Sequence, residues 1–476
     1  MQWDGRDLFR YGTRWSNPRI FFANPMKSLA FAHTDPLVPV LLALVVFGIA
    51  AVIGGQTAKW FKQPAVLGEL LAGMLVGNVA FFLGNPGMTV LREGDALRRI
   101  ADLALVSKVS LADAALTILP PGVHAQRIAD LLAGTKGLDY VGVFLFVDLL
   151  SRIAIVVLLF LVGLETSLGE IKQVGKTALS VAIVGVLVPL GLGLATMRLL
   201  HPDSVWGRDL FVGGILTATS VGITARVLRD LGQQDRKEAR VILGAAVLDD
   251  VLSLLVLAIV TDLALTGTVS LSSVGWSAFK STLFLAGSLL LGIWGTPKVV
   301  RRLARAGIQS VKVVIGCIFA FLLAWLANLA GLAAIVGAFA AGVILNDFFD
   351  KEIEGLSLRE LLTPLESLVV PLFFVWIGMQ VKIETLLDRK VLVVGVALTV
   401  VAIIGKLVSG FVCPRDMKRL AVGFGMMPRG EVGLVFAGIG KSLGVVDDQL
   451  FSAIVLLVMV TTLLAPPALR RTLLSA

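Results

Sequence analysis

The sequence has 476 residues, of which 57% are hydrophobic and only 16% charged, and its mean hydropathy is +0.91. Soluble domains carry about 25% charged residues, so this composition excludes a soluble globular protein. It also excludes a nucleic-acid-binding protein, despite the net charge of +9. The two cysteines, Cys317 and Cys413, indicate neither a disulfide framework nor a metal cluster. No nucleic-acid partner and no cofactor are expected.

Apolar windows predict the membrane spans. A helix needs about 20 largely apolar residues to cross the hydrocarbon core of a bilayer. Windows of that length predict thirteen spans: 37–58, 64–84, 141–168, 177–200, 207–228, 240–265, 273–297, 310–329, 331–348, 362–382, 391–413, 418–443 and 447–469. The fold class that follows is an all-α polytopic membrane protein whose main partner is the lipid bilayer.

Two segments lie outside these spans. Residues 1–36 carry basic residues among aromatics without the apolar stretch of a cleavable signal. They are interpreted as an N-terminal extension lying at the membrane interface. Residues 86–139 form the one long connection, predicted as an extracytoplasmic insertion, and 96–119 within it has the amphipathic pattern of a helix lying on the surface.

Basic residues in short loops indicate the orientation, because cytoplasmic loops are enriched in Lys and Arg. The loops after odd-numbered spans hold 20 such residues, and the short loops on the other face hold 5. The C-terminus is therefore predicted in the cytoplasm and the N-terminus outside it. The expected location is the cell (inner) membrane.

An internal repeat relates the two halves of the chain. Residues Leu67–Gly73 resemble Val336–Gly342, and Phe160–Leu164 resemble Val375–Met379. Val221-Gly222 likewise matches Val432-Gly433. The predicted organisation is a first repeat of six spans (37–265), a linker helix (273–297) and a second, inverted repeat (310–469). Inverted repeats of this kind are typical of secondary transporters with a site at the bilayer midplane.

Two adjacent carboxylates, Asp249 and Asp250, lie inside the sixth span, where an ionisable residue indicates function. Neighbouring side chains on a helix diverge by about 100°, so the two carboxylates face different neighbours. Lys406 in the eleventh span lies at a matching depth and is predicted to pair with Asp249. The alternatives are a purely structural ion pair for the aspartates and a lysine that extends to the interface.

Spans 5 and 12 are interrupted at corresponding positions of the repeat. Span 5 contains Thr219 and Ser220, and span 12 contains Pro428-Arg429-Gly430-Glu431. Such interruptions predict broken helices around a binding site, with oxygen ligands for a small cation. Arg429 and Glu431 are predicted to offset the dipoles of the half-helices. For span 5 alone, helix packing through hydroxyl groups is the alternative.

These residues together resemble the monovalent cation/proton antiporters, especially bacterial sodium/proton exchangers with an adjacent aspartate pair. The resemblance runs from about residue 64 to the C-terminus. It rests on Gln63-Pro64, Gly68-Glu69, Phe160-Leu161-Val162-Gly163-Leu164-Glu165-Thr166, Thr219 to Leu228, Asp249-Asp250 and Pro428 to Glu431.

The resemblance implies a core domain of two crossing broken helices that moves against a separate dimerisation domain, in a homodimer. It implies that Asp250 binds Na⁺, with Asp249 in the same ion- and proton-binding site and Thr219 and Ser220 at the crossover. Lys406 pairs with Asp249, and Arg429 with Glu431 stabilises the interior by charge pairing. An aspartate at position 249 suggests electrogenic Na⁺(Li⁺)/H⁺ exchange by alternating access, in the service of pH homeostasis.

Other functions remain as alternatives. K⁺/H⁺ exchange on the same fold is the serious one, because no residue in the sequence separates Na⁺ from K⁺. An ion channel is a distant alternative, since no repeated filter is apparent. An intramembrane aspartyl protease needs aspartates that converge from separate helices, which positions 249 and 250 do not provide. A transporter, not an enzyme, is therefore expected.

Overall fold

The computed structural model describes residues 37–61, 63–165, 175–233, 236–266, 271–304, 309–352 and 356–474. The expectation for residues 1–36 lies outside this part. All regular elements within it are α-helices: α1 (Leu37–Trp60), α2 (Ala65–Phe82), α3 (Pro86–Leu91), α4 (Asp95–Ser107), α5 (Leu111–Ile118), α6 (Val123–Ala133), α7 (Gly137–Glu165), α9 (Lys176–Leu200), α10 (Trp206–Ile215), α11 (Val221–Asp230), α12 (Lys237–Thr266), α13 (Leu271–Ala304), α14 (Gln309–Leu329), α15 (Ala334–Glu352), α16 (Leu358–Met379), α17 (Ile383–Leu386), α18 (Arg389–Gly410), α19 (Arg419–Gly425), α20 (Glu431–Ser442) and α21 (Asp448–Leu474).

The helices account for the predicted spans and confirm the polytopic membrane fold. In the described part of the chain, nine helices are long and apolar enough to cross a bilayer: α1, α2, α7, α9, α12, α14, α16, α18 and α21. The other four predicted spans correspond to α13, to α15 and to the interrupted pairs α10/α11 and α19/α20. Helices dominate because a bilayer core offers no water to the backbone, so each span must satisfy its own hydrogen bonds.

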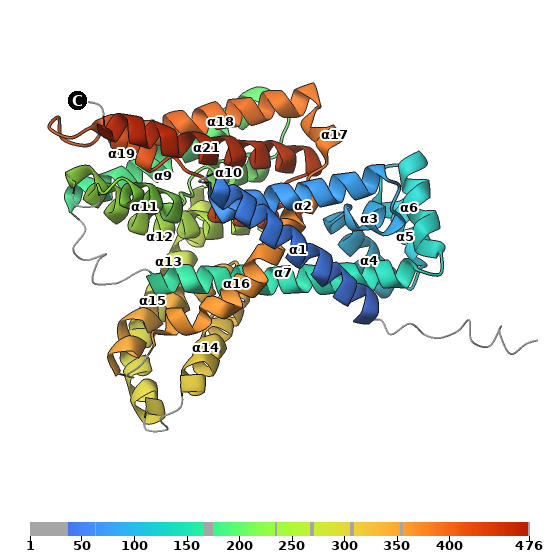
Figure 1. Ribbon diagram of the computed structural model, residues 1–476, viewed down its shortest axis with the longest axis horizontal. Helices are drawn as coiled ribbons and strands as arrows, with labels where there is room; N and C mark the ends of the chain where they lie inside the picture. The colour runs from blue at the N-terminus through green and yellow to red at the C-terminus, as the bar shows by residue number, and fades with distance from the viewer. Residues whose placement is uncertain are drawn as a thin grey trace, which may run out of the picture.

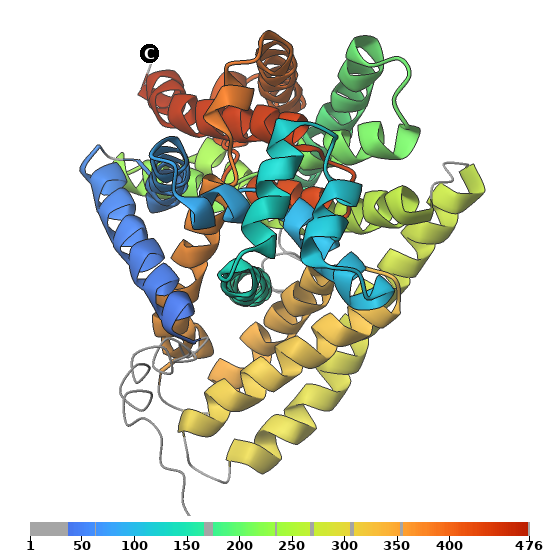
Figure 2. The same cartoon turned by 90° about the vertical axis from the view of Figure 1, so that its right-hand side faces the viewer.

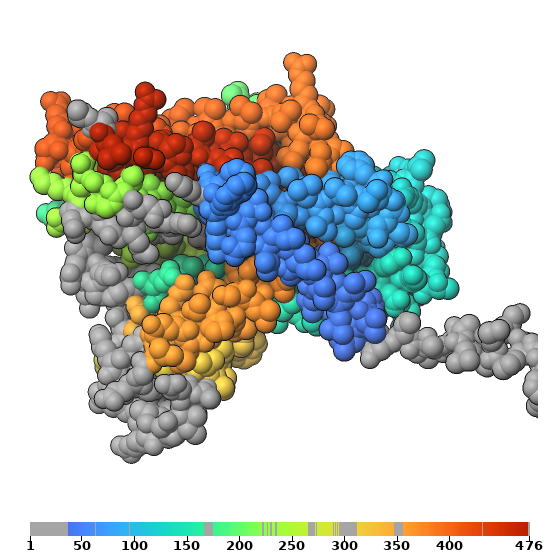
Figure 3. Space-filling view, viewed as in Figure 1, coloured from blue at the N-terminus to red at the C-terminus, as the bar shows by residue number. Residues whose placement is uncertain are grey.

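Apolar side chains cover the outside of these helices, as a bilayer requires. Along α1, Leu42, Val52 and Ile53 are each more than 60% exposed. Figure 3 shows α1 lying across the surface of the molecule. In water such a surface would be costly, whereas lipid tails solvate it.

The helices form two groups, with α18 and α21 at the top of Figure 1 and α14, α15 and α16 at the bottom. Helices α9, α10, α12, α18, α19 and α21 contact one another, and α1, α2, α7, α14, α15 and α16 form a second set of contacts. The long helix α13 contacts α12 of the first set and α15 of the second. We call these sets the crossing group, which also includes α11 and α20, and the flanking group.

Glycines at repeat-related positions make equivalent close contacts in the flanking group. A β-carbon added at Gly73 of α2 would lie 2.1 Å from the carbonyl oxygen of Val375 in α16. One added at Gly342 of α15 would lie 2.2 Å from that of Phe160 in α7. Gly73 aligns with Gly342 in the sequence repeat, and α7 aligns with α16. Small residues therefore bring both helix pairs together in the same way, which supports the internal repeat.

The insertion differs from its prediction in one respect. The expected surface helix over 96–119 is instead two helices, α4 and α5, because Lys108 adopts a left-handed conformation with φ 54° between them. Ser110 then caps α5 by accepting a hydrogen bond from the backbone N–H of Asp113 (3.1 Å). Helices α3–α6 gather at the right-hand end of the molecule in Figure 1, the side that faces the viewer in Figure 2, and their apolar faces share a core with α1, α7 and α16.

Candidate ion-binding site

The two interrupted helices meet at their breaks. Helix α10 ends at Ile215 and α11 begins at Val221, while α19 ends at Gly425 and α20 begins at Glu431. The backbone N–H of Ser220 donates to the carbonyl oxygen of Pro428 at 2.8 Å. The predicted breaks are therefore present at repeat-related positions, and they face each other.

Two hydroxyl groups of the α10/α11 segment donate hydrogen bonds to the end of α19 at this crossing. Thr219 Oγ1 donates to the carbonyl oxygen of Met426 (3.1 Å), and Thr224 Oγ1 donates to that of Gly425 (2.6 Å). Carbonyls at the C-terminal end of a helix have no partner within the helix. The hydroxyls of one broken helix thus satisfy the carbonyls left free by the other, which allows unwound backbone at membrane depth.

Arg429 and Gly430 lie where the two interrupted helices approach each other. Arg429 Nη1 donates to the carbonyl oxygen of Ala218, and Thr462 of α21 donates its hydroxyl proton to the carbonyl oxygen of Arg429. A β-carbon at Gly430 would lie 2.6 Å from Ser220 Oγ. Only glycine, which has no β-carbon, leaves room for the two backbone segments to cross at this distance.

The predicted ion pair between Lys406 and Asp249 is present beside the crossing. Lys406 Nζ of α18 lies 2.9 Å from Asp249 Oδ1 of α12, and both side chains are 0% exposed. Gly185 of α9 lies against the lysine, because a β-carbon there would be 3.5 Å from Nζ. Depth along the spans correctly predicted this contact between residues 157 positions apart.

Several polar atoms at the centre lack a hydrogen-bond partner within the described part of the chain. They are Asp249 Oδ2 and the Nε and Nη2 atoms of Arg429, whose residue is 1% exposed. Arg429 interacts electrostatically with Asp249. Buried polar groups nearly always have partners, so an unsatisfied carboxylate oxygen beside an unsatisfied guanidinium is characteristic of a functional site.

Among the side chains that the structure describes at the centre, the charges balance. Lys406 and Arg429 are two buried cations, and Asp249 with Asp250 supplies two carboxylates. Asp250, the next residue of α12, is only partly buried and interacts electrostatically with Lys406. When all four groups are ionised their charges cancel, so each further cation or proton adds an uncompensated charge. Such a cluster favours competition between cation and proton.

The structure places most of the predicted residues together and leaves one undescribed. Thr219, Ser220 and Arg429 lie at the crossing, and Asp249 pairs with Lys406 beside it. Glu431 begins α20, but its side chain lies outside what the structure describes. The sequence reading did not assign roles to Thr224 or Thr462. Hydroxyls in an apolar span were the only signal for them, and that signal also fits ordinary helix packing.

Comparison with known proteins identifies the relatives of this chain. A family profile described as "Sodium/hydrogen exchanger, transmembrane" matches residues 43–474. The chain is 36% identical over 459 residues to a protein of Synechocystis named high-affinity Na(+)/H(+) antiporter NhaS3, covering 94% of this chain and 93% of that one. It is 33% identical over 380 residues to the Na(+)/H(+)-K(+) antiporter GerN of Bacillus cereus, covering 78% and 94%.

A solved structure shares the fold. The sodium proton antiporter MjNhaP1 of Methanocaldococcus jannaschii superposes with a TM-score of 0.58 at 13% sequence identity, covering 92% of this chain and 99% of that one. At this identity the likeness concerns the fold alone.

Proposed function

The chain belongs to the sodium/hydrogen exchanger family, and from this premise we propose that it is a secondary active antiporter exchanging Na⁺ (or Li⁺) for H⁺. It is a transporter and not an enzyme. The observation that carries the proposal is the cluster of buried charges at the crossing of two broken helices, in which Asp249 Oδ2 is buried and has no hydrogen-bond partner among the described residues.

In this proposal Asp250 binds the cation and Asp249 is the second titrating carboxylate. Asp250 is the more accessible of the two, because Asp249 is fully buried against Lys406. Thr219 keeps acceptor lone pairs after donating its proton, and Ser220 lies beside it at the break. Arg429 and Lys406 make simultaneous occupation by Na⁺ and protons unfavourable, so the two compete.

Electrogenic exchange follows from the same charges. A cycle that returns two protons for one Na⁺ protonates both carboxylates, Asp250 and Asp249. It moves one net charge, which is worth about 2.3 kcal/mol at 100 mV. K⁺/H⁺ exchange is the second candidate, since the name of the relative GerN includes K(+).

The remaining arrangement is also proposed. The crossing group is the moving core domain and the flanking group the dimerisation domain of a homodimer. The two repeats span 37–265 and 310–469 and are joined by the linker helix. Glu431 forms an ion pair with Arg429. The protein lies in the cell inner membrane with its C-terminus in the cytoplasm, its N-terminus outside and the 86–139 insertion on the extracytoplasmic face.

The test is cation-dependent dissipation of a pH gradient in proteoliposomes, with and without a potassium–valinomycin clamp. We expect Na⁺ and Li⁺ to dissipate the gradient in wild type, and Asp250→Asn to reduce this to the background of protein-free liposomes. Asp262→Asn is the matched control, because Asp262 lies on the same helix but bonds to Lys280 (2.9 Å) away from the crossing. Sodium-dependent dissipation retained in Asp250→Asn would contradict the site, and a response to K⁺ alone would favour the second candidate.

A further inference from the structure

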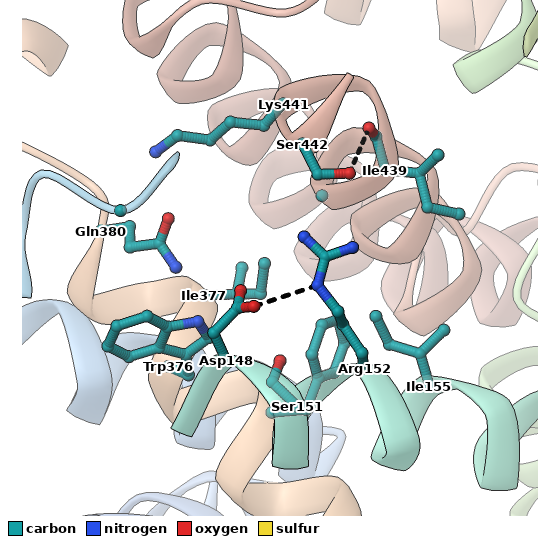
Figure 4. Close-up of a pocket in the computed structure, with 13 residues that line it drawn as sticks. Asp148, Ser151, Arg152, Ile155, Trp376, Ile377, Gln380, Ile439, Lys441 and Ser442 are labelled. Carbon is teal, nitrogen blue, oxygen red and sulfur yellow. Dashed lines mark hydrogen bonds and ion pairs between the residues drawn. The ribbon is translucent and has the colours of Figure 1, made fainter. Parts of the chain in front are cut away.

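A pocket of about 470 Å³, counted with its open mouth, lies between the two helix groups. Its walls come from α7 and α16 of the flanking group and from α20 of the crossing group (Figure 4). Gln380, Lys441 and Ser442 line it at the helix ends nearest the insertion. This pocket is separate from the ion-binding site, whose residues do not line it.

The insertion contributes directly to the pocket wall. Asp148 of α7 accepts a hydrogen bond from Arg152 Nε at 3.0 Å, as the i, i+4 spacing predicts, and also from Arg98 of α4. Gly94, just before α4, lines the pocket itself. The 86–139 segment thus lies at the rim of a cavity between the helix groups.

A chain of charged side chains crosses from the flanking group to the crossing group at this rim. Lys382, between α16 and α17, lies 3.3 Å from Glu93 of the α3–α4 connection and 2.9 Å from Asp448 at the start of α21. Asp448 in turn lies 3.0 Å from Lys441, which lines the pocket at the end of α20. We call Glu93, Lys382, Asp448 and Lys441 the outer bridge.

The insertion and α2 fix the flanking end of the outer bridge. Glu93 is 6% exposed and also contacts His124 Nε2 of α6 at 3.1 Å. Arg92, next to it, bonds to Asn78 of α2 (2.9 Å) and to Glu384 of α17 (3.0 Å). Lys382 is therefore held in place from its own side, and its bond to Asp448 is a contact that joins the two groups.

We propose that Lys382 is a positioning residue for transport: through Asp448 it fastens α20 and α21 to the flanking group and restricts how far the mouth of the pocket opens. The inference rests on the proposed antiport, because movement of the crossing group against the flanking group requires the Lys382–Asp448 contact to break. The 86–139 insertion then sets the strength of the contact through Glu93, which competes with Asp448 for the same ammonium group.

The experiment measures access to the pocket without transport. A Ser442→Cys probe is placed in a Cys317→Ala, Cys413→Ala background in nanodiscs, and its reaction with a charged maleimide is timed. Both faces of a nanodisc are open, so membrane orientation does not matter. We expect Lys382→Gln to accelerate labelling about 1.5- to fivefold, the range that the free energies of partly exposed ion pairs correspond to, and Lys382→Arg to keep the original rate.

Lys280→Gln is the control, because its bond to Asp262 has the same 2.9 Å length but lies outside the pocket. Equal labelling in Lys382→Gln and its parent would overturn the proposal, as would the same acceleration in Lys280→Gln. Should Lys382→Gln fail to fold, Asp448→Asn removes the same contact.

Transport supplies a second readout. In proteoliposomes Lys382→Gln should change kcat about threefold and leave the KM for Na⁺ unaltered, because the ion-binding site is untouched. A changed KM with constant kcat would contradict a role in positioning. One outcome separates the two proposals: wild type exchanges no cation while labelling still responds to Lys382→Gln. That result would contradict the proposed function but would still show that Lys382 controls access to the pocket.

Discussion

Two lysine–aspartate pairs of equal length, 2.9 Å, lie in different surroundings. Lys406–Asp249 is fully buried, whereas Lys382 is 17% and Asp448 39% exposed. Water can replace a partner that the outer pair loses. At membrane depth Asp249 has no such access to water, and among the described cations beside it only Arg429 could compensate for the loss of Lys406. A lysine–aspartate pair at the rim can therefore break and re-form at little cost. The equivalent pair in the interior is needed to balance the buried charges.

The largest difference between the two pairs is expected in stability. Lys406→Ala leaves Asp249 buried without its ion-pair partner, which costs up to about 3–5 kcal/mol, less whatever Arg429 compensates. Lys382→Ala should cost about 1 kcal/mol or less, because Asp448 keeps water and Lys441. Unfolding of the purified protein in detergent measures both.

The double variant Lys406→Ala, Asp249→Ala serves as the control for this comparison. Removing both charges should recover part of the loss, since the unpaired carboxylate is the cause. Equal destabilisation by Lys406→Ala and Lys382→Ala would show that burial does not separate the two pairs.

The helix crossing should also tolerate less change than the surface of the flanking group. Gly430→Ala places a β-carbon 2.6 Å from Ser220 Oγ, and overpacking of this kind costs about 1–3 kcal/mol. Gly142→Ala on α7 meets nothing within 4 Å and should stabilise its helix by about 0.5–1 kcal/mol. Thermal melting of the two variants measures the contrast, and a neutral Gly430→Ala would mean that the breaks can separate at no cost.

The smallest expected effect is the pH dependence of the outer bridge. Burial alone would raise the pKa of Glu93, but the hydrogen bond from His124 and the charge of Lys382 outweigh it and hold the pKa below 4.5. Burial would lower the pKa of Lys382, yet Glu93 and Asp448 raise it above 10.5. The contribution of Glu93 is therefore complete above its unfolded value of about 4.5 and is lost as pH falls through the folded pKa. That of Lys382 is complete below about 10.5 and is lost as pH rises beyond it.

Thermal melting of wild type and Glu93→Gln at a series of pH values tests whether the contribution of Glu93 to stability is lost at low pH. The difference in stability, about 1 kcal/mol or less, should be present at neutral pH and shrink as the pH falls below about 4.5. A difference that grows on acidification would show that Glu93 is not held as a carboxylate.

The sequence anticipated the interior better than the rim. Depth along two apolar spans sufficed to pair Lys406 with Asp249, because a charge inside a membrane has few partners to choose from. Repeat-related interruptions likewise located the breaks at 216–220 and 426–430. By contrast, 289 positions separate Glu93 from Lys382, and loop charges have many possible partners in water. No pattern in the sequence linked the insertion to α21.

What the sequence determined by itself is the set of spans, because a bilayer obliges each segment to close its own backbone hydrogen bonds and apolar length alone marks such segments. The sequence also identified the ionisable residues inside the spans, whose burial at membrane depth indicates a function. The tertiary structure decided how the broken helices satisfy each other and how the insertion reaches the rim of the pocket. Those contacts depend on helix packing through glycines such as Gly73 and Gly430, whose partners lie far away in the chain and have no local signature.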